Sequence, residues 1–507
     1  MPARGYRPFV ALDVHTEREV KFEGRMGAPL PDLRPLVGGT FRHPRQVLHT
    51  AYFDSVDGRL WSRGLTLRHR TTEGDGHGVW TLKTPVGSGH SLVRNEFSWP
   101  GDRGEVPRDA QRILRGVLRR ESLRQLVELE TVRERLSLRD DEDRTLAELD
   151  DDLVTVSGGQ RDGLRFRQVE LELQSEHWSG RPVVHRLEAA GFTVGSSPKL
   201  ALAMPQAAGG PGDPHLDRKS TLAELVRMRL REGFDRLVDH DWRLRIAAPD
   251  FDPRDIHRAR VATRRLRSDL KSLGGVLDPI WKGHMRSDLK WLGSALGEVR
   301  DLDVLRKNLK GIPPELDRTI VELRDAANER LTLVLEDDRY LDALDRLHAA
   351  SDRVPLAGGD ATELARGRAR DALPDIVGAN WRKLRRQVRK ARRHPSPERL
   401  HKVRIKAKEL RYSSESATTF VEGPARRLAK AARRLQDELG EHHDAVAAGD
   451  WLRALAHEDR GTRLSGDVAF QAGGVAADIR RRQAHVEATW EHYWRQLRKP
   501  RRIHWLR

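Results

Sequence analysis

The chain has 507 residues, more than one ordinary hydrophobic core can organise, so we expect about two to four domains. Hydrophobic residues make up 37% and charged residues 33% of the sequence, a balance that excludes a disordered polyelectrolyte and predicts a soluble globular protein. The absence of cysteine excludes disulfides, thiolate nucleophiles and cysteine-ligated zinc or iron–sulfur centres.

The net charge of +17 is concentrated in the second half of the chain. Residues 1–210 hold 31 Lys and Arg against 30 Asp and Glu, whereas residues 211–507 hold 62 against 46. The basic half predicts a polyanionic partner, either nucleic acid, polyphosphate or an acidic membrane surface, and charge alone does not choose among them. No apolar run approaches the roughly 18–20 residues that span a bilayer, and the N-terminus lacks an apolar signal region, so we expect a cytoplasmic protein without a membrane segment.

In chain order, short alternating runs come first and long helical patterns follow. The alternating runs predict about eight strands, at 16–22, 47–53, 65–70, 79–83, 92–98, 132–138, 146–150 and 166–173. Helices are predicted near 108–128 and, after Pro182, near 183–190. The sequence PQAAGGPGDPH at 205–215 is typical of a linker, and the residues after it have the 3.6-residue periodicity of an all-helical domain. We therefore predict domains at 1–205 and 218–507, joined by a linker at 206–217.

Charged residues recur at every second position of the predicted strands, which places them on one face of a sheet. Glu17, Glu19 and Lys21 share a face of the first strand. The same spacing pairs Arg68 with Arg70, Arg94 with Glu96, Arg133 with Arg135, Glu148 with Asp150, and Glu170 with Glu172, and it includes Lys83. For any single strand a solvated face explains this pattern. Repetition of acids and bases on nearly every strand favours an interior that binds a polyvalent anion such as triphosphate, with carboxylates as ligands of Mg²⁺ or Mn²⁺.

These motifs resemble those of the CYTH superfamily, the triphosphate tunnel metalloenzymes. The resemblance covers nearly all of residues 15–203 and rests on EREVK at 17–21, YFD at 52–54, LRHR at 67–70, WTLK at 80–83, RNE at 94–96, AELD at 147–150, ELE at 170–172 and SPK at 197–199. It implies an α+β domain built on an eight-stranded antiparallel β-barrel whose tunnel binds triphosphate and a divalent metal. The family includes inorganic triphosphatases, thiamine triphosphatases and class IV adenylate cyclases.

The resemblance also assigns roles to individual residues. The implied catalytic residues are Glu17, Glu19 and Lys21, and the implied metal ligands are Glu17, Glu19, Glu148, Asp150, Glu170 and Glu172. The implied phosphate-binding residues are Lys21, Arg68, Arg70, Lys83, Arg94, Arg133, Arg135 and Lys199. Pro198 departs slightly from the pattern because it removes a backbone donor directly before Lys199. His69 lies at the wrong position in the alternation and is predicted on the outer face.

The helical half contains an internal repeat. DIHRARVATRRLR at 255–267 matches RLHKVRIKAKELR at 399–411, and LGEVRD at 296–301 matches LGEHHD at 439–444, with offsets of 144 and 143 residues. Helical spacing gives each copy a basic stripe, consisting of His257, Arg260, Arg264 and Arg267 in the first and His401, Arg404, Lys408 and Arg411 in the second. Residues 382–411 hold 14 Lys and Arg against two Glu, a self-repulsion that requires an acidic partner inside or outside the protein.

This half resembles the CHAD domain over roughly 218–500, through the two HxxR[VI]xx[RK]xLR segments and the two LGE segments. The resemblance implies duplicated four-helix bundles, at about 218–360 and 361–507, with inorganic polyphosphate bound to the stripes between them. The stripes contain no aromatic residue before Tyr412, which disfavours single-stranded nucleic acid as the ligand. Glu298 with Asp301, and Glu441 with Asp444, are equally consistent with internal ion pairs and with metal binding. Adjacent His442 and His443 diverge on a helix and are not predicted as a site.

The favoured function is a metal-dependent triphosphatase that hydrolyses inorganic triphosphate, with Mg²⁺ or Mn²⁺ as cofactor and a helical domain that binds polyphosphate. Such a protein would be cytoplasmic, with polyphosphate granules as a place of association. One alternative is adenylate cyclase or thiamine triphosphatase activity on the same scaffold. Another is a non-catalytic protein that binds polyphosphate or nucleic acid.

Overall fold

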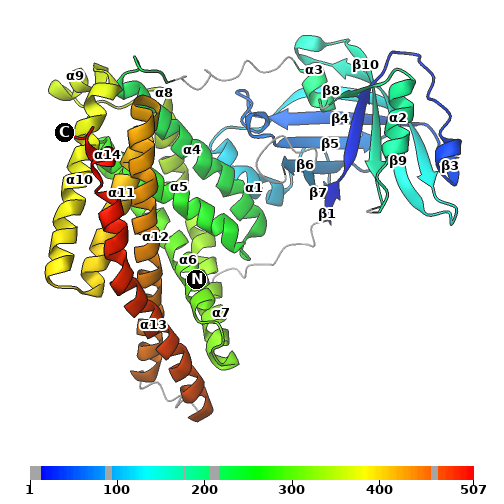
Figure 1. Ribbon diagram of the computed structural model, residues 1–507. Helices are drawn as coiled ribbons and strands as arrows, with labels where there is room; N and C mark the ends of the chain where they lie inside the picture. The colour runs from blue at the N-terminus through cyan, green and yellow to red at the C-terminus, as the bar shows by residue number, and fades with distance from the viewer. Residues whose placement is uncertain (1–12, 86–93, 176, 196, 205–215, 458–465) are drawn as a thin grey trace, which may run out of the picture. The chain divides into compact units, whose positions relative to one another are not determined.

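The computed structural model describes residues 13–85, 94–175, 177–195, 197–204, 216–457 and 466–507, so the predicted linker at 206–217 lies largely outside the described residues. The chain divides into two compact units, Met1–Pro211 and Gly212–Arg507, and each is described separately (Figure 1). Within the described ranges, no helix has both the length and the apolar character needed to cross a membrane.

The N-terminal unit is an antiparallel sheet with three helices. Its strands are β1 (Asp13–Glu17), β2 (Glu19–Glu23), β3 (Gly39–Arg42), β4 (Gln46–Asp54), β5 (Thr66–Thr72), β6 (Val79–Pro85), β7 (Arg94–Pro100), β8 (Arg124–Arg139), β9 (Thr145–Ser157), β10 (Arg165–Leu173) and β11 (Thr193–Gly195). Its helices are α1 (Arg108–Leu118), α2 (Arg181–Ala189) and α3 (Lys199–Ala203). The strand order is β1-β7-β6-β5-β4-β8-β9-β10-β2-β11, and β3 pairs with β8.

The expected eight-stranded closed barrel is therefore replaced by an eleven-stranded sheet whose pairing runs from β1 to β11. Arg18 interrupts the first predicted strand, and this break leaves β1 paired with β7 while β2 pairs with β10. The chain from β1 to β2 therefore pairs with β7 near one end of the strand order and with β10 near the other end. The short strands β3 and β11, which carry too few alternating residues to be recognised in the sequence, account for the remaining difference.

The predicted helix near 108–128 is correct only for its first half. Helix α1 ends at Leu118, and β8 begins at Arg124. From Val127 onward, buried and exposed residues alternate as in a strand, and the pairing of β8 with β4 and β9 overrides the helical propensity of its Leu and Glu residues.

Apolar residues cover the sheet on two opposite sides. On one side, Phe22, Leu149 and Leu171 pack against Val183 and Leu187 of α2. On the other, Leu200 and Ala203 of α3 belong to a buried cluster whose sheet members are Tyr52, Val127, Leu129, Val154 and Val156. By strand alternation, this second cluster continues the face that carries the predicted tunnel residues, so α3 covers one end of that face.

The C-terminal unit is all-helical, as predicted. Its helices are α4 (Leu222–Ala247), α5 (Pro253–Ser272), α6 (Pro279–Asn308), α7 (Pro314–Glu336), α8 (Asp338–Asp352), α9 (Asp360–Arg366), α10 (Ala369–Arg393), α11 (Pro397–Ser416), α12 (Thr418–His457), α13 (Gly466–Leu497) and α14 (Pro500–Ile503). Helices α4 to α7 pack in succession, as do α10 to α13, and between the two series α5 contacts α11 and α6 contacts α12. The duplicated four-helix bundles remain a prediction that this packing is consistent with.

Candidate functional site

Lys21 lies at the centre of the predicted tunnel residues. Its Nζ is 2.7 Å from a carboxylate oxygen of Glu19 and 2.7 Å from one of Glu170, its register partner on β10. Burial alone would lower the pKa of Lys21, but the Glu170 and Glu19 carboxylates outweigh it and raise the pKa above its ordinary value. Lys21 is therefore a permanent cation here.

Asp152 joins two further cations to Glu170. It is fully buried, accepts hydrogen bonds from Arg133 Nε (2.8 Å) and Nη2 (2.6 Å), and lies 3.0 Å from Lys199 Nζ. Lys199 also reaches Glu170, at 2.6 Å. Pro198 does not disturb this placement, because Lys199 is the first residue of α3, where a preceding backbone donor is not needed. Sequence analysis missed Asp152 as a site residue.

Arg135 continues the same network along β8 and β9. Its guanidinium donates two hydrogen bonds to Asp150, at 2.7 and 2.9 Å, and lies 2.8 Å from Glu148. Asp150 is in addition 2.5 Å from Arg133 Nη1. Ion pairs thus connect residues of β2, β8, β9, β10 and α3 into one network. We call this surface the charged face; its described network members are Glu19, Lys21, Arg133, Arg135, Glu148, Asp150, Asp152, Glu170 and Lys199.

Two other predicted cations form a separate group on β5 and β6. Arg68 Nη2 lies 3.6 Å from Glu96 of β7, and Lys83 forms an ion pair with the same carboxylate. Arg68 Nε is buried without a hydrogen-bond partner in the described residues. The sequence analysis placed Glu96 on the same face as Arg94 and gave it no further role. In the structure, its carboxylate pairs with both Arg68 and Lys83.

Arg70 stands between the two groups. Its Nε donates a hydrogen bond to Thr50 at 3.0 Å, and no described carboxylate lies within ion-pair distance. Burial, together with the charges of Arg68 and Arg133, lowers the pKa of Arg70 to about 9. Arg70 is therefore one of the phosphate-binding candidates available to an incoming anion.

The remaining predicted residues are less well defined. The side chain of Glu17 lies outside the described residues, although its backbone pairs with Arg94. Glu172 is half-buried and accepts a hydrogen bond from Gln174 at 3.3 Å. Arg94 is half-buried on β7, and no described carboxylate pairs with it.

The strand register places three carboxylates in one row. Glu172 of β10 is the register partner of Glu19 on β2 and of Glu148 on β9. Like charges directly opposite on a sheet are destabilising, and a row of oxygen donors is the ligand type that Mg²⁺ and Mn²⁺ prefer. The donor set therefore fits a hard divalent cation. In the described residues no three such side chains are already gathered around a metal position, because Glu19 and Glu148 pair with Lys21 and Arg135.

The charged face is neutralised differently from our expectation. The sequence suggested that an anionic ligand must balance its cations, whereas Lys21, Lys83, Arg133, Arg135 and Lys199 already have carboxylate partners within the protein. The folded protein therefore does not require a bound anion, and a ligand would have to exchange partners with these ion pairs.

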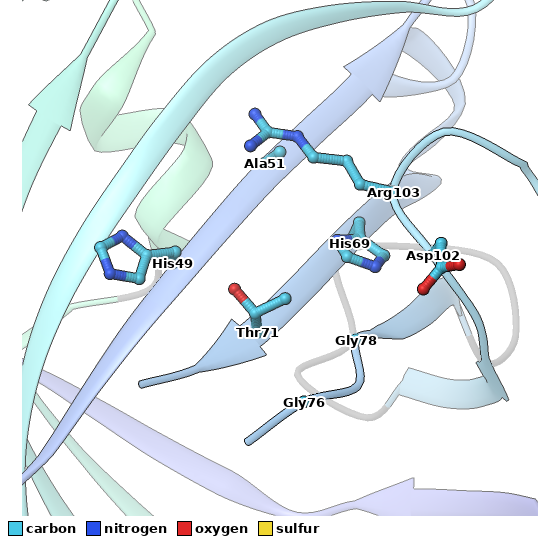
Figure 2. A pocket seen from close by; sticks show the side chains of 8 residues that line it. All are labelled: His49, Ala51, His69, Thr71, Gly76, Gly78, Asp102 and Arg103. Atoms are coloured by element: carbon cyan, nitrogen blue, oxygen red, sulfur yellow. The ribbon is translucent and has the colours of Figure 1, made fainter. Parts of the chain in front are cut away.

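His69 lies on the opposite side of β5 from Arg68 and Arg70, as the alternation predicted. It is buried, one ring nitrogen lies 3.0 Å from the Gly101 carbonyl oxygen, and its ring contacts Trp80. Figure 2 shows it beside His49 and Thr71 in a pocket of about 160 Å³. This pocket is separate from the charged face.

In the helical unit, the two predicted stripes meet. Burial and the positive charges of Arg264 and Arg260 lower the pKa of Arg404, although Asp444 opposes them. Burial, with the charges of Arg264 and Arg404, lowers the pKa of Lys408 to about 7. Cations from α5 and α11 therefore lie close together. We call Arg260, Arg264, His401, Arg404 and Lys408 the basic cluster.

The LGE glycines lie against arginines of the basic cluster, and Gly297 is needed to make room for Arg260. A Cβ atom at Gly297 would collide with the guanidinium of Arg260, and one at Gly440 would lie 3.6 Å from Arg404 Nε. Each repeat thus places a glycine of its LGE segment against the second cation of its stripe. The two motifs recognised in the sequence form one structural unit.

His443 lies against the basic cluster, a position that the sequence analysis did not predict. Its ring contacts that of His401, with centroids 4.2 Å apart and the ring planes tilted by 42°, and burial with the neighbouring cations lowers the pKa of His443 to about 4. His442 points elsewhere, to Glu487 at 3.1 Å, so the two adjacent histidines diverge as predicted. Alignment of the repeats could have identified His443, because its counterpart is Arg300, a neighbour of His257.

The other stripe members and acids have different surroundings. His257 and Arg267 are exposed, and Arg411 pairs with Glu415 at 2.8 Å. Asp301 is an internal partner of Arg260 at 3.1 Å, whereas Glu298 pairs with Arg330 at 3.0 Å. The structure thus supports internal ion pairing for Asp301.

Known proteins match both units. The family model described as CYTH domain matches residues 15–185, and the one described as CHAD domain matches residues 228–453. An uncharacterized protein of Mycobacterium tuberculosis is 27% identical over 495 residues, which cover 89% of this chain and 90% of that protein.

Two solved structures are similar to parts of the chain. The CHAD domain of the plant Ricinus communis is 26% identical, with 55% of this chain and 93% of that chain covered and a TM-score of 0.44. A Hippeastrum protein described as revealing a dominant triphosphatase activity is 17% identical, with 37% and 94% covered and a TM-score of 0.24. Taken together with the two family models, the motifs and their placement show that this chain carries a CYTH domain followed by a CHAD domain.

Proposed function

We propose that the N-terminal unit is a metal-dependent triphosphatase that hydrolyses inorganic triphosphate. The observation that carries the proposal is the convergence of Lys21, Arg133 and Lys199 on one buried carboxylate pair, Asp152 and Glu170. Such a network holds cations in fixed positions, and fixed cations stabilise the charge that develops on transferred phosphoryl oxygens.

Substrate binding would exchange ion-pair partners. Triphosphate oxygens would take over the cations of the network, beginning with Arg70, whose guanidinium lacks a described carboxylate partner. The carboxylates released from Lys21 and Arg135 would then be free to hold the divalent cation, with Glu19, Glu148 and Glu172 as its ligands. The metal would supply charge neutralisation and an activated water.

A phosphate-release panel tests this proposal. The full chain is incubated with inorganic triphosphate, ATP, thiamine triphosphate or long-chain polyphosphate, each with Mg²⁺, Mn²⁺ or chelator. We expect the fastest release from inorganic triphosphate and none with chelator. Cyclic AMP formed from ATP would identify a cyclase instead, and no turnover of any substrate would support a non-catalytic binding protein.

We also propose that the helical unit binds inorganic polyphosphate at the basic cluster. The cluster brings half-buried cations from both repeats together, and burial with the charges of neighbouring cations lowers the pKa values of Arg404 and Lys408. A thin chain of phosphates can reach such a cluster and relieve this repulsion.

Matched variants test the assignment. Ala replaces Arg260, Arg264, Arg404 and Lys408 in one variant and the exposed residues Lys307, Lys310, Arg366 and Arg480 in the control. Both variants replace four basic residues. We expect only the cluster variant to bind polyphosphate at least tenfold more weakly in a titration at fixed ionic strength. Equal losses in both variants would show that net charge, not the cluster, attracts the polymer.

A further inference from the structure

A second basic surface of the C-terminal unit is separate from the basic cluster. Helix α10 buries Trp381, Leu384 and Val388 and turns its cations outward. We call this surface the α10 face; its members are Arg382, Arg385, Arg386, Arg389, Arg392 and Arg393 on α10, Arg427, Lys430 and Arg434 on α12, and Arg495, Arg498, Arg501 and Arg502 near the C-terminus.

The three parts of the α10 face lie next to one another (Figure 1). Trp381 of α10 stacks on Trp494 of α13, with ring centroids 5.2 Å apart, and the Arg382 guanidinium contacts the carbonyl of Arg507. On the other side, α14 at the C-terminal end contacts α12, and burial with the charges of Arg501, Arg434 and Arg427 lowers the pKa of Arg502. The cations therefore form one continuous surface.

Almost all of the positive charge of the α10 face lacks a carboxylate partner among the described residues. Among the described residues, the only side-chain carboxylate in ion-pair contact with a member of the α10 face is Glu491, which lies 3.2 Å from Arg392, and the terminal group of Arg507 contacts Arg382. The sequence contains no Asp or Glu between Arg382 and Pro397. Self-repulsion along α10 is thus not relieved within the chain, and this observation points to an external polyanion.

We propose that the α10 face binds duplex nucleic acid without reading its sequence. Packed helices lie about 8–10 Å apart, so the cations form rows across a broad surface, which phosphates of both strands beside a groove about 12 Å wide can neutralise together. A single phosphate chain would follow only one row. Trp381 and Trp494 are buried against each other and do not offer a stacking platform to single strands. Exposed large apolar side chains, the anchors of a membrane surface, are absent from the described residues of this face.

The test measures binding of a 30-base-pair DNA duplex to the full chain by fluorescence anisotropy over a series of salt concentrations. One variant replaces Arg385, Arg386 and Arg389 with Gln, and the control replaces exposed Lys307, Lys310 and Arg366 with Gln. Each lost phosphate contact should lower the slope of log affinity against log salt by about 0.9, which corresponds to about tenfold to a hundredfold weaker binding near 150 mM salt for three contacts.

The proposal predicts this loss for the α10 variant, no loss for the control, and unchanged release of phosphate from triphosphate in both. Circular dichroism should show the same fold in all three proteins, and the α10 variant should melt no lower than the wild type, because its substitutions remove like charges from one helix. Equal duplex affinity of the two variants would overturn the proposal. So would a wild-type chain that ignores the duplex while the α10 substitutions weaken polyphosphate or anionic-vesicle binding, because that result would assign the face to another polyanion.

Discussion

Replacement of Asp152 with Asn tests whether the buried network positions the phosphate-binding cations. The substitution keeps the shape of the side chain but removes the charge that faces Arg133 and Lys199. Removing one partner of a buried ion pair costs about 3–5 kcal/mol. Arg133 retains Asp150 and Lys199 retains Glu170, so we expect a smaller loss, of about 2–3 kcal/mol. For a unit of this size that corresponds to a melting temperature lower by about 4–12 °C.

The pH dependence of this loss has a defined sign. Burial alone would raise the pKa of Asp152, but Lys199 and Arg133 outweigh it and lower the pKa below the ordinary value of 3.8. A carboxylate with a lowered pKa stabilises the fold fully above its unfolded-state pKa, and the contribution is lost as pH falls through the folded-state pKa. The stability gap between wild type and Asp152→Asn should therefore be full above about pH 4 to 5 and shrink below that range.

Asp151→Asn is the matched control. Asp151 is the next residue of β9, faces the other side, and makes a comparable two-point ion pair with Arg167, at 2.7 and 2.6 Å. Calorimetry of the full chain should show destabilisation of both variants. Only Asp152→Asn should lower kcat/KM for inorganic triphosphate, by tenfold or more, because only it releases Arg133 and Lys199 from their positions. Equal kcat/KM in the two variants would refute the positioning role.

Four further outcomes are expected. Glu19→Gln should abolish metal-dependent phosphate release with the fold intact by circular dichroism, and activity within threefold of wild type would remove Glu19 from the metal ligands. Arg70→Ala should raise KM for triphosphate about tenfold without lowering the melting temperature, since its buried guanidinium lacks a described carboxylate partner; an unchanged KM would contradict this. Polyphosphate affinity should rise as pH falls from about 8.5 to 6, because bound phosphate raises the pKa of Lys408 from about 7, and Lys408→Met should weaken this dependence; calorimetry in two buffers would detect the proton uptake. A fragment ending at Gly210 should still hydrolyse triphosphate, and a folded but inactive fragment would show that the helical unit is needed.

The alternation of the strands predicted which side chains face one another, but not which of them form ion pairs. Lys21 and Glu170 were recognised because each is flanked by apolar residues, and Arg133 was recognised because it alternates with Arg135. Asp152 was missed because it ends a run of three aspartates, and such a run hides the alternation: Asp151 pairs with Arg167 on the opposite side. Which of these residues form ion pairs depends on the register across three strands, and no local sequence pattern encodes that register.

Helical periodicity was similarly informative only within one helix. It identified the stripes on α5 and α11 but could not show that they face each other, because that depends on contacts between residues some 140 positions apart. The break at Arg18 also escaped prediction. A strand that pairs with two different partners along its length needs a bend. Here the bend results from pairing with β7 and β10, and the residues around Arg18 carry no signal for it.

The short helix α3 has two structural roles. Lys199 at its first position contacts Asp152 and Glu170, while Leu200 and Ala203 close the apolar end of the same face. A polymer could not slide past this end without pulling the lysine from its carboxylates. We therefore expect an enzyme built on this face to act on a long phosphate chain from its end, because a chain that passed α3 would have to displace its apolar side chains as well as exchange the ion pairs of Lys199.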